Sequence, residues 1–147
     1  MKETKEMAVK AGCLIKKKNE HALQSMCVKW FRYAHPGVML FAVPNGGARS
    51  AVTGAVLKAE GALPGVADLV LCAPSLDENG ETVHGLFIEM KTQTGVWRQN
   101  QREFAAAVRA AGYRYEVVRT FDQFARLCDM HVAGFGLIAA TDEGKGR

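Results

Sequence analysis

Asp68-Leu-Val-Leu-Cys-Ala73 and Leu86-Phe-Ile-Glu-Met-Lys91 are the two stretches that decide the fold. Each contains a short apolar run, which is typical of a buried β-strand. Between them, residues 74–82 are polar and contain Asn79-Gly80, a dipeptide that favours a tight hairpin turn. We therefore expect residues 68–73 to pair antiparallel with a return strand over residues 83–91.

The hairpin gathers ionisable residues at one end of the sheet. Antiparallel pairing sets the start of one strand against the end of the other, so Asp68 is expected beside Glu89. Side chains alternate along a strand, so Glu89 and Lys91 share a face while Met90 points into the core. Two carboxylates can hold Mg²⁺ or Mn²⁺, which prefer oxygen ligands. Taken alone, however, a Glu-x-Lys triplet is more often a solvated strand end.

The flanking segments predict helices and further strands. Apolar residues at helical spacing predict helices over residues 20–33, 49–60, 96–111 and 121–130, and short apolar or alternating runs predict strands over 38–43 and 113–118. This order predicts an α/β domain with a mixed central sheet and helices on both faces. We expect a basic arm or frayed helix over residues 1–18, one domain over 19–133 and a C-terminal tail over 134–147, of which residues 141–147 are small and polar.

The charge is distributed unevenly. The formal net charge is +4, with lysines concentrated in residues 1–33 and arginines in residues 98–126, whereas residues 60–89 hold acidic side chains and no basic one. Basic flanks around an acidic centre suit a polyanion held over a metal site. Ordinary solvated surface charges explain the same pattern equally well.

Several other classes of protein are disfavoured. The lysine-rich N-terminus has no long apolar run after it, so we expect neither a signal peptide nor a membrane partner. We expect the protein to work in the cytoplasm. Asn45-Gly46-Gly47 lacks the Gly-Lys-Ser/Thr ending of a phosphate-binding loop, so we expect no nucleotide cofactor.

Further motifs accompany the hairpin in a fixed order. They are Glu20-His-Ala-Leu-Gln24, Pro44-Asn-Gly-Gly-Ala-Arg49, Lys58 with Gly61-Ala-Leu-Pro-Gly-Val-Ala-Asp68, and Leu86-Phe-Ile-Glu-Met-Lys-Thr92 with Gly95 and Gln101. Over about residues 19–127 the chain thereby resembles the VRR-NUC nucleases, a branch of the PD-(D/E)xK phosphodiesterase superfamily. The resemblance implies a restriction-endonuclease-like core. Ala67 replaces a frequent proline and Val96-Trp97-Arg98 replaces a frequent serine, but neither change removes a ligand.

The resemblance also implies a role for each matching position. Asp68, Glu89 and the backbone carbonyl of Met90 are expected to bind Mg²⁺ or Mn²⁺, with Glu20 binding directly or through water. Lys91 is the expected catalytic lysine, and Gln101 is expected to contact the scissile region. Without the resemblance, Glu20 and Gln101 would be interpreted as exposed helix residues. The expected DNA contacts are Asn45, Gly46, Arg49, Lys58, Trp97, Arg98 and Arg102, with Trp97 as a wedge or interface residue.

The implied activity is metal-dependent, structure-selective cleavage of DNA, extending to four-way (Holliday) junctions cut by a homodimer. Small family members of this type resemble viral (phage) or bacterial proteins, which places this chain in a bacterial or virus-infected cell. One alternative is a monomeric nuclease that acts on flaps, nicks or single strands. Another is a catalytically silent DNA-binding module, whose mark would be the loss of Asp68, Glu89 or Lys91; all three are present.

Overall fold

The computed structural model of the chain describes residues 20–44 and 50–143, with side chains described as far as residue 140. The helices are α2 (Glu20–Ala34), α3 (Ala51–Ala59), α4 (Gln99–Ala110) and α5 (Phe121–Glu143). The strands are β1 (Leu40–Ala42), β2 (Leu69–Leu71), β3 (Ser75–Leu76), β4 (Thr82–Val83), β5 (Leu86–Met90) and β6 (Arg114–Val118). The predicted arm over residues 1–18 and the DNA contacts Asn45, Gly46 and Arg49 lie outside the described residues.

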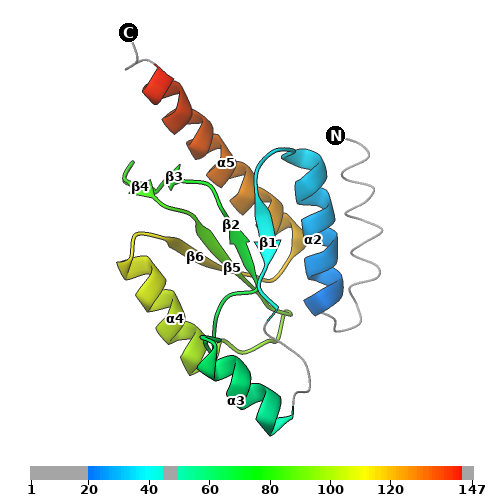
Figure 1. Cartoon of the computed structure of the whole chain (residues 1–147). Helices are drawn as coiled ribbons and strands as arrows, with labels where there is room; N and C mark the ends of the chain where they lie inside the picture. The colour runs from blue at the N-terminus through cyan, green and yellow to red at the C-terminus, as the bar shows by residue number, and fades with distance from the viewer. Residues whose placement is uncertain (1–19, 45–49, 144–147) are drawn as a thin grey trace.

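The central sheet has the order β1-β2-β5-β6 (Figure 1). β1, β2 and β5 pair antiparallel, whereas β5 and β6 pair parallel, so the predicted mixed sheet is confirmed. β2 and β5 are the two strands of the predicted hairpin, and Leu69 lies opposite Ile88. Continuing this register by one residue sets Asp68 opposite Glu89, at the end of the sheet.

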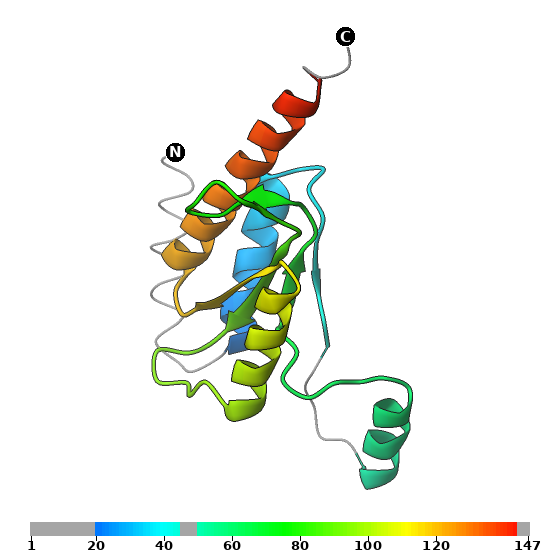
Figure 2. The ribbon, with the colours of Figure 1, turned by 90° about the vertical axis from the view of Figure 1, so that its left-hand side faces the viewer.

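Helices cover both faces of the sheet, as predicted (Figures 1 and 2). One face packs on α2 and α5 through alternate strand residues that include Leu69, Ile88 and Met90. The other face packs on α4 through residues that include Phe87 and Tyr115. Because side chains alternate along β5, Glu89 lies on the face that α4 covers.

The return strand of the hairpin is divided, which the sequence did not predict. Val83 belongs to β4, which pairs with β3 in a separate two-stranded sheet, and β5 begins only at Leu86. The expected turn does form, with Gly80 at φ +78°. The interruption occurs where the N–H of His84 turns away to donate to the carbonyl of Gly112, at 2.9 Å.

The last helix is much longer than predicted. α5 continues to Glu143, so the expected helix end at Met130 is wrong, and most of the segment expected as a C-terminal tail is helical. The helix continues because His131 is fully buried and Phe135 packs against the main core. A Cβ atom at Gly134 would overlap the hydroxyl of Ser75, so this glycine allows the helix to pack closely on β3.

α3 stands apart from the sheet (Figure 2). It is capped by Ser50, whose hydroxyl accepts the N–H of Thr53 at 3.1 Å, and the predicted stop at Gly61 is confirmed by its φ of +102°. None of its residues is buried, and Val52 is 74% exposed. Among the described residues, no helix combines the length and apolar character that crossing a membrane requires.

Candidate active site

The two predicted metal-binding carboxylates meet at the end of the β2–β5 hairpin. Asp68 comes just before β2, and its Oδ2 accepts the backbone N–H of Met90 at 2.8 Å. The N–H of Lys91 donates to the carbonyl of Val118 on β6, at 2.9 Å. The backbone that carries Glu89 is therefore held from both neighbouring strands, and the Met90 backbone lies at the site while its side chain is buried in the core.

Glu89 is the most enclosed acidic group of the site, with 2% of its surface exposed. Its Oε1 accepts hydrogen bonds from Gln101 Nε2 at 2.6 Å and from Lys91 Nζ at 3.0 Å. Its Oε2 is buried and has no hydrogen-bond partner among the described residues. A buried carboxylate oxygen without a partner is costly, so a cation at this oxygen would be favourable.

Burial and mutual repulsion disfavour the charged forms of both carboxylates. Burial, followed by the charge of Asp68, raises the pKa of Glu89 to about 7. Burial likewise raises the pKa of Asp68, against the opposing effects of the Met90 N–H and the Lys91 ammonium. A divalent cation would reverse this situation, because it stabilises both carboxylates in their ionised state.

The donor set fits Mg²⁺ or Mn²⁺ better than a metal that needs a closed protein cage. Within residues 20–44 and 50–140, no three His, Cys, Asp or Glu side chains are arranged to hold a metal ion. Asp68, Glu89 and the Met90 carbonyl would supply oxygen ligands only. Mg²⁺ is commonly held by one or two carboxylates while it keeps several waters, so this set is sufficient.

Glu20 reaches the same site from the opposite layer of the domain. It is the first residue of α2, and its Oε1 accepts the N–H of Thr92 at 3.3 Å. Its charge also contributes to raising the pKa values of Asp68 and Glu89. The predicted placement of Glu20 near the carboxylates therefore holds, and Thr92, which was given no role of its own, supplies its contact.

Gln101 reaches Glu89 because the start of α4 is held close to the hairpin. Its Oε1 accepts the N–H of Arg98 at 3.0 Å, at the beginning of the helix. Gly65, with φ +84°, packs so closely on this turn that a Cβ atom would overlap the carbonyl of Asn100. The Pro64-Gly65 turn before Asp68 thus brings α4 and the carboxylates together.

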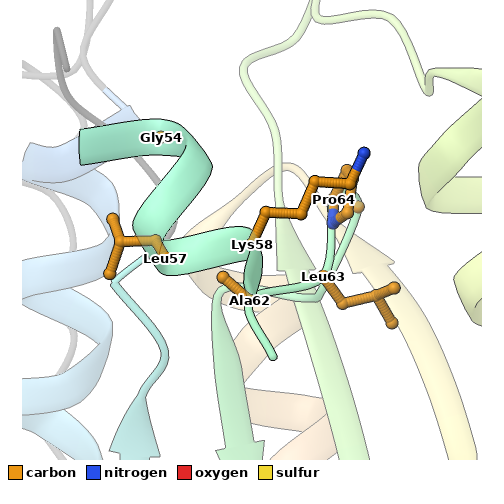
Figure 3. A pocket seen from close by; sticks show the side chains of 7 residues that line it. Gly54, Leu57, Lys58, Ala62, Leu63 and Pro64 are labelled. Atoms are coloured by element: carbon orange, nitrogen blue, oxygen red, sulfur yellow. The ribbon is translucent and has the colours of Figure 1, made fainter. Parts of the chain in front are cut away.

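The predicted DNA contacts that are described fall into separate places. Trp97 is half-buried and stacks on Tyr115, with 6.1 Å between the ring centroids, and the Arg102 guanidinium covers its ring. This packing does not favour the predicted wedge. Arg98 is exposed at the start of α4. Lys58 is exposed on α3 and extends toward Pro64 over a hollow that also includes Leu57, Ala62 and Leu63 (Figure 3).

The structure adds Arg119, a residue that the sequence gave no reason to single out. Its Nη1 donates to the carbonyls of Thr92 and Gly95, at 2.7 and 2.8 Å, in the loop that follows Lys91. In the sequence it is one of six arginines between residues 98 and 126. Only the position of β6 beside β5 distinguishes it from the others.

Comparison with known proteins agrees with this architecture. A model of the VRR-NUC domain matches residues 6–122. A solved structure described as a VRR_NUC domain protein superposes with a TM-score of 0.66 at 18% sequence identity, over 80% of this chain and 91% of that chain. No curated protein matches the chain. The matched segment contains the hairpin, α4 and the side chains that meet at the end of the sheet, which are those of Glu20, Asp68, Glu89, Lys91 and Gln101. The chain therefore belongs to the VRR-NUC domain family.

Proposed function

We propose that this protein is a Mg²⁺- or Mn²⁺-dependent endonuclease that hydrolyses phosphodiester bonds in DNA at a site built from Asp68, Glu89 and Lys91. Membership of the VRR-NUC family supports a nuclease, since this domain has a nuclease-type fold. The observation that carries the metal dependence is the buried Glu89 Oε2, which has no partner among the described residues and lies on a carboxylate beside Asp68.

Each side chain has a defined task in this proposal. A bound divalent cation would polarise the scissile phosphodiester. Gln101 and Lys91 both donate to Glu89 Oε1, so Oε2 is the oxygen that would hold the cation. The Lys91 ammonium, with 8% of the residue exposed, then donates to the attacking water or to the phosphate oxygen on which charge develops.

We further propose that the substrate is branched DNA, including four-way junctions, and that the working form is a homodimer. A two-fold dimer would set two identical sites on a two-fold-symmetric junction. The exposed apolar residues of α3 support a second copy as its partner: Val52 is 74% exposed and Val56 is 51% exposed, on a helix without a buried residue. The sedimentation coefficient at working concentration tests this directly.

The experiment that tests the site is cleavage of a labelled panel with Mg²⁺, Mn²⁺ or EDTA. The panel contains a four-way junction, a flap, a nicked duplex, a plain duplex and a single strand. Wild type is compared with Glu89→Ala and with Glu81→Ala, which removes an exposed carboxylate from the β3–β4 turn as a matched control. We expect metal-dependent cutting by wild type and Glu81→Ala, and none by Glu89→Ala although it still binds DNA.

The pattern of products separates the alternatives. Paired symmetric cuts on the junction by a dimeric species support the resolvase. Cutting of flaps, nicks or single strands by a monomer supports the monomeric nuclease instead. DNA binding without cleavage by wild type would overturn the enzymatic proposal and favour the silent binding module.

A further inference from the structure

The loop that follows Lys91 contacts two of the site residues at once. In residues 92–95, the N–H of Gly95 donates to the carbonyl of Thr92 at 3.1 Å and closes a tight turn. The Thr92 N–H donates to Glu20 Oε1. A Cβ atom at Gly95 would lie 3.3 Å from Lys91 Cδ, so the turn also packs against the lysine side chain.

Arg119 holds this turn from the neighbouring strand end. Its Nη1 donates to the Thr92 carbonyl at 2.7 Å and to the Gly95 carbonyl at 2.8 Å, so one nitrogen joins both ends of the turn. Hydrogen bonds from a charged donor are among the stronger ones in proteins. Without this cation, the Thr92 carbonyl would keep the Gly95 N–H as a partner, whereas the Gly95 carbonyl would lose the donor that holds it.

Arg119 is itself anchored on a rigid part of the fold. It follows the last residue of β6, Val118, whose carbonyl accepts the N–H of Lys91. Its own N–H donates to Gln123 Oε1 at 2.8 Å, in the first turn of α5. The strand that pairs with the Lys91 backbone therefore also carries the group that fixes the loop beyond it.

We propose that Arg119 is a positioning residue of the nuclease site, a role that rests on the function proposed above. By holding the carbonyls of Thr92 and Gly95, it directs the Thr92 N–H to Glu20 and keeps the turn packed on Lys91. It acts through these residues and makes no contact with the scissile phosphate.

Three variants of the full-length protein separate this role from others. Arg119→Met removes the donors at similar length, whereas Arg119→Lys keeps a cation whose three N–H groups can replace part of the two bonds. Arg126→Met removes an exposed arginine of α5 and is the matched control for lost positive charge. Outer partners of metal-site ligands typically contribute about 10–100-fold in activity or metal affinity, so we expect kcat to fall by that factor in Arg119→Met.

The expected pattern is specific. Arg119→Met lowers kcat, Arg119→Lys restores part of it, and Arg126→Met leaves it unchanged. In all three variants KM stays within about 3-fold of wild type, and the slope of DNA affinity against salt concentration stays the same. In metal-free protein without DNA, hydrogen exchange at the Thr92 amide accelerates in Arg119→Met, while the core strands keep their protection.

Two results would overturn the proposal. Weaker DNA binding with a reduced salt slope in Arg119→Met would make Arg119 a phosphate contact. Unchanged exchange at Thr92 would show that the turn does not depend on Arg119. The exchange measurement needs no nuclease activity. It therefore tests whether Arg119 holds the turn even if the wild-type protein cuts no substrate.

Discussion

Gln101 and Glu89 are joined by a 2.6 Å hydrogen bond from Nε2 to Oε1, which ties the start of α4 to the second carboxylate of the site. The other end of the same amide accepts the N–H of Arg98, so its nitrogen is turned toward Glu89. This arrangement occupies Oε1 of Glu89, while Oε2, the oxygen that we propose as a metal ligand, has no partner among the described residues. Gln101 therefore fixes the orientation of the Glu89 carboxylate.

Replacing Gln101 should weaken metal-dependent catalysis. Gln101→Leu removes the donor, so we expect kcat to fall by about 10–100-fold and half-maximal activity to need more Mg²⁺. Gln101→Glu should be worse, because a third carboxylate beside Glu89 raises its pKa further. Metal titrations of the cleavage rate test this, with Gln99→Leu on an exposed position of the same helix as the control. A wild-type rate for Gln101→Leu would exclude the role assigned to the amide.

Glu89 should make the metal-free protein less stable at high pH. Its pKa is raised from 4.5 to about 7 in the folded state, so the folded protein binds this proton more tightly than the unfolded chain. The corresponding stability is complete below about pH 4.5 and is lost as the pH rises through about 7. Glu89→Gln cannot ionise, so in EDTA it should unfold at a higher temperature than wild type at pH 8 and differ much less at pH 5.

The same variant tests the metal site. Mg²⁺ stabilises the ionised carboxylates, so it should raise the Tm of wild type at pH 8 by mass action and have little effect on Glu89→Gln. An equal response of both proteins to Mg²⁺ would place the metal elsewhere. If the difference in Tm between wild type and Glu89→Gln were the same at pH 5 and pH 8, the raised pKa of Glu89 would be contradicted.

Gly65 should be far less tolerant of substitution than Gly61. Both have positive φ, which costs a residue with a Cβ atom about 1–2 kcal/mol. In Gly65→Ala the new atom would also overlap the Asn100 carbonyl, whereas Gly61 has nothing within 4 Å. We therefore expect Gly65→Ala to lose stability and cleavage rate, and Gly61→Ala only stability. Equal rates for the two variants would mean that the start of α4 need not be held by this turn.

Gly134 and Gly136 offer a matched test of the long last helix. A Cβ atom at Gly134 would overlap Ser75 Oγ, so Gly134→Ala should destabilise the protein by about 1–3 kcal/mol. Gly136 lies in the same helix and has nothing within 4 Å, so Gly136→Ala should stabilise the protein by about 0.5–1 kcal/mol. Urea unfolding measures both. A neutral result at both positions would indicate that α5 ends before Gly134.

The sheet and the meeting of the carboxylates were predictable because their signals are local. The Asn79-Gly80 turn and the two apolar runs specify an antiparallel pair, and this pairing alone puts Asp68 opposite Glu89. The family resemblance added Glu20 and Gln101, and the structure brings Glu20 to Thr92 from α2 and Gln101 to Glu89 from α4. Their catalytic and metal-binding roles stay predictions.

What the sequence did not predict depends on contacts between distant segments. The helix was expected to end at Met130, and its continuation depends on the packing of α5 on β3, where Gly134 meets Ser75. Trp97 was expected as a DNA wedge or an interface residue, and its stacking on Tyr115 from β6 could not be inferred from the sequence around it. Arg119 finds its acceptors 24 and 27 residues earlier in the chain, and no local pattern marks such a contact.

The order of the site residues along the chain also has a consequence for biosynthesis. The hairpin with both carboxylates leaves the ribosome before α4, β6 and the first turn of α5 have been made. A nascent chain therefore carries Asp68 and Glu89 without Gln101 to orient the second carboxylate and without Arg119 to fix the loop after Lys91. Because we expect each of these contacts to contribute about 10–100-fold to kcat, a nascent chain, or a chain terminated before Arg119, should cut DNA far more slowly than the finished protein.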